Sequence, residues 1–105
     1  MFNLSIIGIP QSEIEIFCQR HGIRKLALFG SVLTDDFNTD SDIDVLVEYL
    51  PEKRITFLDM VQQEAQLTAL IGRQVDLRTA MELSRHSRKS VLNNAQVIYT
   101  LILPN

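Results

Sequence analysis

The chain has 105 residues, of which 46% are hydrophobic and 22% charged, and this composition predicts one globular domain, residues 1–105, rather than a disordered chain. Its net charge of −3 argues against direct nucleic acid binding, which depends on basic contacts to phosphate. With one cysteine, Cys18, no signal peptide in residues 1–10 and no run of membrane-spanning length, the chain is expected in the cytoplasm, without a disulfide and away from membranes.

Hydrophobic spacing predicts helices and strands in alternation. Ser12 and Glu15 form a capping-box pattern, which predicts a helix that begins near Ser12 and ends near Gly22. A strand over residues 25–29 is followed by a short helix over 32–37, opened by Ser31, and by a second strand over 42–48. The remaining predicted elements are a helix over 56–71 that ends at Gly72, a strand over 74–77, a helix over 80–93 and a short strand over 96–100. We therefore predict an α/β fold, with a small mixed sheet flanked by helices.

Three acidic residues are placed for metal binding. In the second predicted strand alternate side chains share a face, which puts Asp42 and Asp44 away from the apolar side, about 6.6 Å apart along the strand. Asp76, flanked by Val75 and Leu77, also faces away from the apolar side of its strand. Two carboxylates about 5 Å apart repel by roughly 3 kcal/mol at an effective dielectric of about 20. A cation is therefore expected between them, and Mg²⁺ suits such oxygen ligands best.

Gly30 and Ser31 form the other half of the pattern, ten residues ahead of the acidic pair. Glycine allows a tight turn and close approach of a ligand to the backbone, and amides at the start of a helix attract phosphate. Alone, each feature has a plainer explanation: a turn glycine, a capping serine or solvated carboxylates. Together they predict a site for a nucleoside triphosphate and metal. An EF-hand calcium loop starting at Asp40 is excluded, because its sixth and twelfth positions hold Val45 and Pro51 instead of glycine and glutamate.

From about residue 23 to residue 99, the chain resembles the minimal nucleotidyltransferase (MNT) domain, a small member of the polymerase-beta-like nucleotidyltransferase superfamily. The runs that carry the resemblance are Phe29-Gly30-Ser31, Ser41-Asp42-Ile43-Asp44-Val45-Leu46-Val47, Gly72-Arg73-Gln74-Val75-Asp76-Leu77 and the closing segment Val91–Tyr99. The resemblance implies the polymerase-beta-like nucleotidyltransferase fold. It also implies that Gly30 and Ser31 bind the triphosphate of ATP, and that the catalytic and metal-binding residues, expected to hold two Mg²⁺ ions, are Asp42, Asp44 and Asp76.

The activity expected from this site is transfer of AMP from ATP to a hydroxyl group. A domain of this size offers only part of a cleft, so an acceptor or a partner protein should supply the rest. The resemblance implies that this partner is a HEPN-domain ribonuclease toxin, which MNT proteins pair with in a hetero-oligomer and adenylylate on tyrosine, acting as antitoxins.

Two alternatives to this function stay open. One is a nucleotidyltransferase that modifies a small hydroxyl compound such as an antibiotic. The other is an antitoxin without catalysis, which neutralises its toxin by masking it. The sequence also does not name the acceptor residue or the nucleotide. It leaves open, as triphosphate or partner contacts, five basic residues: Arg54, Arg73, Arg85, Arg88 and Lys89.

Overall fold

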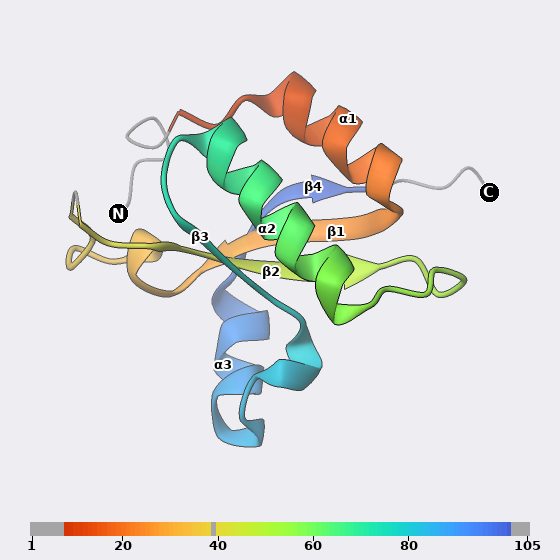
Figure 1. The fold of residues 1–105 in the computed structure, drawn as a ribbon. Coiled ribbons are helices and arrows are strands. Elements are labelled where there is room, and N and C mark those ends of the chain that lie inside the picture. The colour runs from red at the N-terminus through yellow and green to blue at the C-terminus, as the bar shows by residue number, and fades with distance from the viewer. Residues whose placement is uncertain (1–7, 39, 102–105) are drawn as a thin grey trace.

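The computed structural model of the protein describes residues 8–38 and 40–101 (Figure 1). The helices are α1 (Gln11–His21), α2 (Phe57–Ile71) and α3 (Arg85–Asn94), and the strands are β1 (Ile23–Phe29), β2 (Ile43–Tyr49), β3 (Val75–Arg78) and β4 (Gln96–Thr100). Two short 3₁₀ helices, Gly30–Leu33 and Ala80–Glu82, follow β1 and β3. Within the described ranges, none of the helices is both long and apolar enough to span a membrane.

The four strands form one mixed sheet in the order β3-β2-β1-β4. β1 is antiparallel to both of its neighbours, whereas β2 and β3 run parallel. The helices α1 and α2 cover one face of the sheet, and α3 lies on the opposite side (Figure 1). The predicted α/β fold with a small mixed sheet flanked by helices is therefore confirmed.

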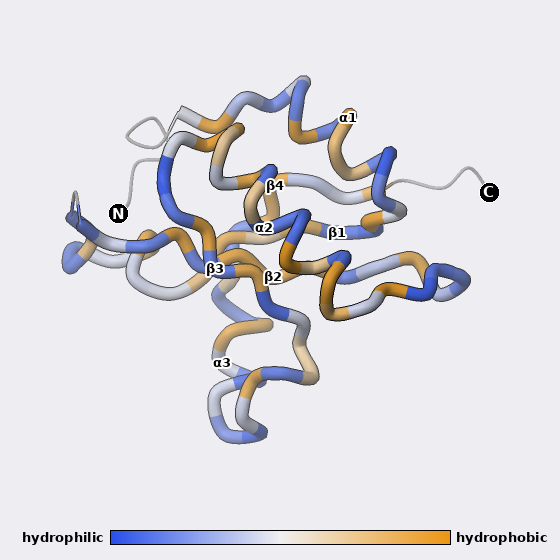
Figure 2. Tube along the Cα trace, viewed as in Figure 1, coloured by the Kyte–Doolittle hydropathy of each residue, from blue (hydrophilic) through white to orange (hydrophobic). Residues whose placement is uncertain are grey.

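The core fills the space between the sheet and the helices α1 and α2. The alternating residues Ile43, Val45 and Val47 of β2 are at most 2% exposed, as the strand pattern predicted. Cys18 is buried among them, and its burial raises the pKa of the thiol to about 12, so the sulfur is a protonated packing atom. Figure 2 shows hydrophobic residues along the central strands, whereas the first turns of α3 are hydrophilic. The polar half of β2 is thus free to carry chemistry on the α3 side.

The predicted capping box at the start of α1 is wrong. The helix begins at Gln11, Pro10 occupies the N-cap position, and within the described residues no side chain caps the first turn. The carbonyl of Pro10 accepts the first helical hydrogen bond from the amide of Ile14, at 2.9 Å. Ser12 is therefore the second residue of the helix, and it lies too late in the chain to serve as the N-cap.

The short helix after β1 is also shifted from its predicted position. It is a 3₁₀ helix over Gly30–Leu33 with Phe29 at its N-cap, rather than a helix over 32–37 opened by Ser31. Thr34 ends it, because both its amide and its hydroxyl donate to the carbonyl of Ser31, each at 2.9 Å. Gly30 and Ser31 therefore lie inside the first turn instead of preceding it.

The predicted helix over 80–93 is interrupted. The structure has a 3₁₀ helix, Ala80–Glu82, and then α3, Arg85–Asn94. Each piece has its own start: Thr79 opens the first with a capping box, and the hydroxyl of Ser84 accepts from the amide of Ser87 at 3.1 Å. Thr79 and Ser84 are thus two separate N-caps, and the chain changes direction between the 3₁₀ helix and α3.

Candidate active site

Three predicted site residues, Asp42, Asp44 and Asp76, occupy neighbouring positions at one end of the sheet. Asp44 pairs with Asp76 across the parallel strands β2 and β3, and with Phe29 across β1. Paired strands lie about 4.8 Å apart, so the two carboxylates start from adjacent backbone positions. Asp42 lies two residues before Asp44, immediately ahead of β2. The register of the sheet thus gathers acids that are far apart in sequence.

The electrostatics of the site centre on Asp44, which is partly buried. Burial is the first cause of a raised pKa at its carboxyl, and the negative charges of Asp76 and Asp42 raise that pKa further. Arg78 opposes these effects and lowers the pKa. A group whose ionised form is disfavoured in this way gains from a nearby cation, and carboxylate oxygens suit Mg²⁺. The chemistry of the donors therefore fits the expected metal.

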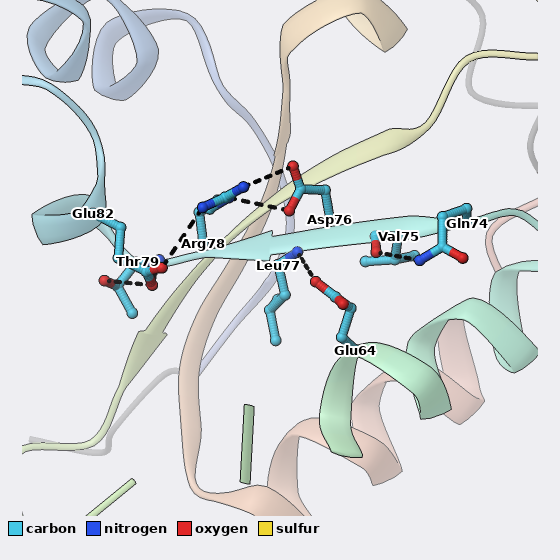
Figure 3. Close-up of polar contacts among 8 residues, drawn as sticks. All are labelled: Glu64, Gln74, Val75, Asp76, Leu77, Arg78, Thr79 and Glu82. Carbon is cyan, nitrogen blue, oxygen red and sulfur yellow. Dashed lines mark hydrogen bonds and ion pairs between the residues drawn. The ribbon is translucent and has the colours of Figure 1, made fainter. Parts of the chain in front are cut away.

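Arg78 forms an ion pair with Asp76 in this structure. Its Nε donates to Oδ1 of Asp76 at 3.1 Å and its Nη2 to Oδ2 at 3.4 Å, while Nη1 lies 3.9 Å from Oε2 of Glu82 (Figure 3). Hydrogen bonding to Asp76 raises the pKa of Arg78. Across residues 8–38 and 40–101, no three His, Cys, Asp or Glu side chains are arranged to hold a metal ion. The guanidinium of Arg78 therefore takes the place beside Asp76 at which a cation was expected. The side chain of Asp76 would have to rotate away from Arg78 to share a metal ion with Asp42 and Asp44.

Gly30 packs directly against Asp44. Its φ is +77°, in the left-handed region that favours glycine. A Cβ added to Gly30 would lie only 3.1 Å from Cγ of Asp44 and would contact the carboxylate oxygen still more closely. The structure thus brings the predicted phosphate-binding turn and the predicted metal ligand together, with Ser31 next in the chain. Pairing of Phe29 with Asp44 is the reason for this proximity.

Arg73, one of the basic candidates, secures the loop that leads to Asp42. Its Nη2 donates to the carbonyl of Asn38 at 2.5 Å and to that of Ser41 at 3.1 Å. Its guanidinium also lies over the ring of Phe37, 4.5 Å from the centroid. These contacts give Arg73 a role in positioning the loop.

Arg88 has a comparable structural role at the other end of the site. Its Nε donates to the carbonyl of Ala80 at 2.8 Å and its Nη2 to that of Leu83 at 3.0 Å, which ties α3 to the 3₁₀ helix before it. Three further basic candidates are exposed: Arg54, Arg85 and Lys89. Arg78, which the sequence analysis overlooked, is the basic residue that reaches the acids. The signal for it was present, because residues 76 and 78 share a face in a strand.

The outer edge of β3 is closed by side chains. The hydroxyl of Thr68 accepts from the amide of Val75 at 3.0 Å, and Oε2 of Glu64 accepts from the amide of Leu77 at 2.8 Å (Figure 3 shows the second). Both acceptors lie one turn apart on α2. The side chain of Gln74 donates to the carbonyl of Val75 at 3.0 Å (Figure 3). The strand that carries Asp76 is therefore fixed to α2 by its backbone.

Two cavities flank the acids. The Gly30 cavity measures about 660 Å³ and lies between the 3₁₀ helix after β1 and α3. This volume is within the range of about 300–1,000 Å³ that is usual for small-ligand sites. Its lining includes Gly30, Leu33, Ser87, Ser90 and Asn94. The Asp76 cavity measures about 250 Å³ and lies at the outer edge of β3. Its lining comes from α2, β3 and the second 3₁₀ helix, and includes Phe57, Val61, Glu64, Asp76, Arg78 and Glu82. Asp76 thus lines the smaller space, and Gly30, which packs against Asp44, lines the larger one.

Comparison with known proteins gives a consistent result. The nucleotidyltransferase domain family matches residues 13–98 of the chain. The protein adenylyltransferase MntA of Thermococcus cleftensis is 35% identical over 95 residues, which cover 90% of this chain and 89% of the relative. A solved structure described as a minimal nucleotidyltransferase is 30% identical, with a TM-score of 0.71, and the match covers 90% of this chain and 94% of that one.

A more distant match shares the fold. It is a chain of the complex between a tri-AMPylated HEPN toxin of Shewanella oneidensis and its MNT antitoxin. The TM-score is 0.62 at 16% identity, and the match covers 87% of this chain and 70% of that one.

Proposed function

Because the chain belongs to the nucleotidyltransferase domain family, as its motifs predicted, we propose that it transfers AMP from ATP to a tyrosine hydroxyl of a partner HEPN ribonuclease toxin and thereby acts as the antitoxin. Membership of the family makes it a nucleotidyltransferase. The Thermococcus relative, a protein adenylyltransferase, and the Shewanella complex with its AMPylated HEPN toxin support the finer proposal. The observation that carries it is the contact of Gly30 with Asp44, beside Asp76, which joins a phosphate-binding turn to paired acids.

The proposed binding site for ATP is the Gly30 cavity. The volume of about 660 Å³ suits a nucleotide, and its lining combines apolar side chains with the hydroxyl and amide groups of Ser87, Ser90 and Asn94. With the nucleoside there, the triphosphate reaches the turn at Gly30 and Ser31, and its α-phosphorus lies toward Asp44. The chain thus binds the donor on one side of the acids and leaves the Asp76 side open to the acceptor.

The chemistry is an in-line displacement at the α-phosphorus. The acceptor oxygen forms a bond to phosphorus while the bond from phosphorus to the bridging oxygen breaks, and pyrophosphate leaves. Asp42, Asp44 and Asp76 would hold two Mg²⁺ ions, which would supply neutralisation of the charge on the triphosphate. Asp76, once its carboxylate has turned away from Arg78, takes or directs the proton of the attacking hydroxyl.

Ser31→Ala is expected to weaken ATP binding by about 1.5 kcal/mol, the lower end of the usual loss for a hydrogen bond to a charged group. This is roughly a tenfold rise in Kd, measured by titration calorimetry with ATP and Mg²⁺. Ser12→Ala, an exposed serine on α1, is the matched control and should leave the Kd unchanged. Equal affinity in the two variants would show that Ser31 does not contact the triphosphate.

The proposed function is tested by co-expression with a HEPN partner and mass spectrometry of that partner. We expect a stable complex and, with ATP and Mg²⁺, a gain of whole AMP masses on a tyrosine, together with loss of ribonuclease activity. A partner that is neutralised without any gain of mass would establish masking in place of catalysis. A partner that is neither bound nor modified would contradict the proposal and return attention to a small hydroxyl compound.

A further inference from the structure

An apolar surface borders the Asp76 cavity and has no evident role inside the molecule. Phe57 and Val61 lie one turn apart on α2, are 84% and 44% exposed, and both line this cavity. The start of α2 does not depend on Phe57, because Thr56 and Asp59 already form a complete capping box. Apolar side chains exposed around a cavity next to reactive groups indicate a surface that another molecule covers.

We propose that the Asp76 cavity is the acceptor subsite, in which an aromatic side chain of the partner packs against Phe57 and Val61 and presents its hydroxyl to Asp76. This inference rests on the proposed function and adds the surface that selects the acceptor. The cavity holds about 250 Å³, which is below the range of about 300–1,000 Å³ typical for drug-sized ligands, so it suits one side chain. A serine or threonine would reach Asp76 but leave the apolar wall uncovered.

The charges around the cavity indicate which residues flank the aromatic side chain in the partner. Glu64, Asp76 and Glu82 contribute three carboxylates, and Arg78 is the one basic residue among the described residues that line the cavity. Arg78 is already shared by Asp76 and Glu82. The rim is therefore negative, and it attracts a positively charged segment. The partner segment is thus a tyrosine flanked by basic residues.

Binding to the cavity is tested first without ATP. Amide resonances of the ¹⁵N-labelled protein are followed while acetyl-Arg-Tyr-Arg-amide is added to millimolar concentration. We expect the largest shifts at Phe57, Val61, Asp76 and Arg78, and clearly smaller shifts with the matched peptides in which serine replaces tyrosine or glutamate replaces both arginines. Shifts that are absent, or confined to residues outside the lining of the cavity, would overturn the proposal.

The second test uses transfer to the co-expressed HEPN partner. Phe57→Ser should raise the KM for the partner by about tenfold while kcat and the Kd for ATP stay near their wild-type values. Leu58→Ser is the matched control, because Leu58 is 62% exposed on the same turn but lies outside the cavity lining. Equal KM values for the two variants would overturn the proposal. A failure of the proposed function looks different, since the wild type itself would then transfer no AMP, and the peptide titration would still decide whether the subsite exists.

Discussion

The Asp42→Asn/Asp44→Asn variant is expected to lose AMP transfer by about a thousandfold or more while its fold stays intact. The proposed chemistry places the triphosphate against these two carboxylates, and loss of a group that stabilises charge in the transition state costs about 10²–10³ in rate for each group. Transfer is measured as AMP gained by the HEPN partner over time. Asparagine keeps the size of the side chain, so the change tests charge and metal binding alone.

Stability should move in the opposite direction to activity in this variant. The folded-state pKa of Asp44 is raised above its ordinary value, so the folded state binds this proton more tightly than the unfolded state does. The free energy of unfolding therefore falls as pH rises through the folded-state pKa of Asp44. At neutral pH, where Asp44 is ionised, its charge destabilises the fold. Without Mg²⁺, we expect the variant to melt at or above the wild-type temperature at neutral pH. Added Mg²⁺ should raise the melting temperature of the wild type only.

The matched control for these measurements is Asp35→Asn/Asp36→Asn. It also removes two negative charges, but from exposed positions of the loop ahead of the site. Its transfer rate and its response to Mg²⁺ should equal those of the wild type. Full activity in the Asp42/Asp44 variant would show that the site has been placed wrongly, and a lower melting temperature would show that these acids have favourable contacts within the fold.

Gly30→Ala should strongly weaken ATP binding. An alanine at φ +77° costs about 1–2 kcal/mol in backbone strain. The new Cβ would also lie 3.1 Å from Cγ of Asp44, closer than non-bonded carbons normally approach, so the turn or the carboxylate has to move. Both groups are proposed contacts of the nucleotide. We expect the Kd for ATP, measured by calorimetry with Mg²⁺, to rise by more than about tenfold.

Gly72→Ala separates strain from function in this experiment. Gly72 ends α2 at φ +82°, and no heavy atom of the described residues lies within 4 Å of a Cβ built there. The backbone penalty is therefore similar, but the site is not touched. Its melting temperature should fall, though by less than that of Gly30→Ala because no clash adds to the strain, while its affinity for ATP stays at the wild-type level. Identical ATP affinity in both variants would contradict the role of the turn at Gly30.

The prediction from sequence succeeded where one face of an element is buried. The alternation around Ile43 and Val45 identified β2 and its outward acid, because burial enforces that pattern. It failed where neighbouring caps compete. Pro10 started α1 ahead of Ser12, and Ser84 began α3 where a continuous helix was expected, since a cap acts through one local hydrogen bond that spacing alone does not rank.

The site shows the same division. Strand alternation predicted that Asp44 and Asp76 face away from the core, and the register of β2 with β3 places these two residues opposite each other. The ion pair between Asp76 and Arg78 was missed, because rotamers of long side chains do not follow from spacing. The Asp76 cavity was also beyond the sequence, since its walls come from α2, β3 and a 3₁₀ helix whose packing only the fold defines.

The closed edge of β3 determines how another protein can approach this molecule. A bare edge strand would invite a partner, or a second copy, to extend the sheet through main-chain hydrogen bonds, a mode of recognition that accepts almost any extended segment. Here Thr68 and Glu64 occupy the amides of Val75 and Leu77. The surface that remains accessible beside Asp76 is made of side chains. Binding of another protein there therefore depends on the shape and charge of its side chains. Sheet extension and edge-to-edge aggregation at β3, the strand that carries Asp76, are disfavoured.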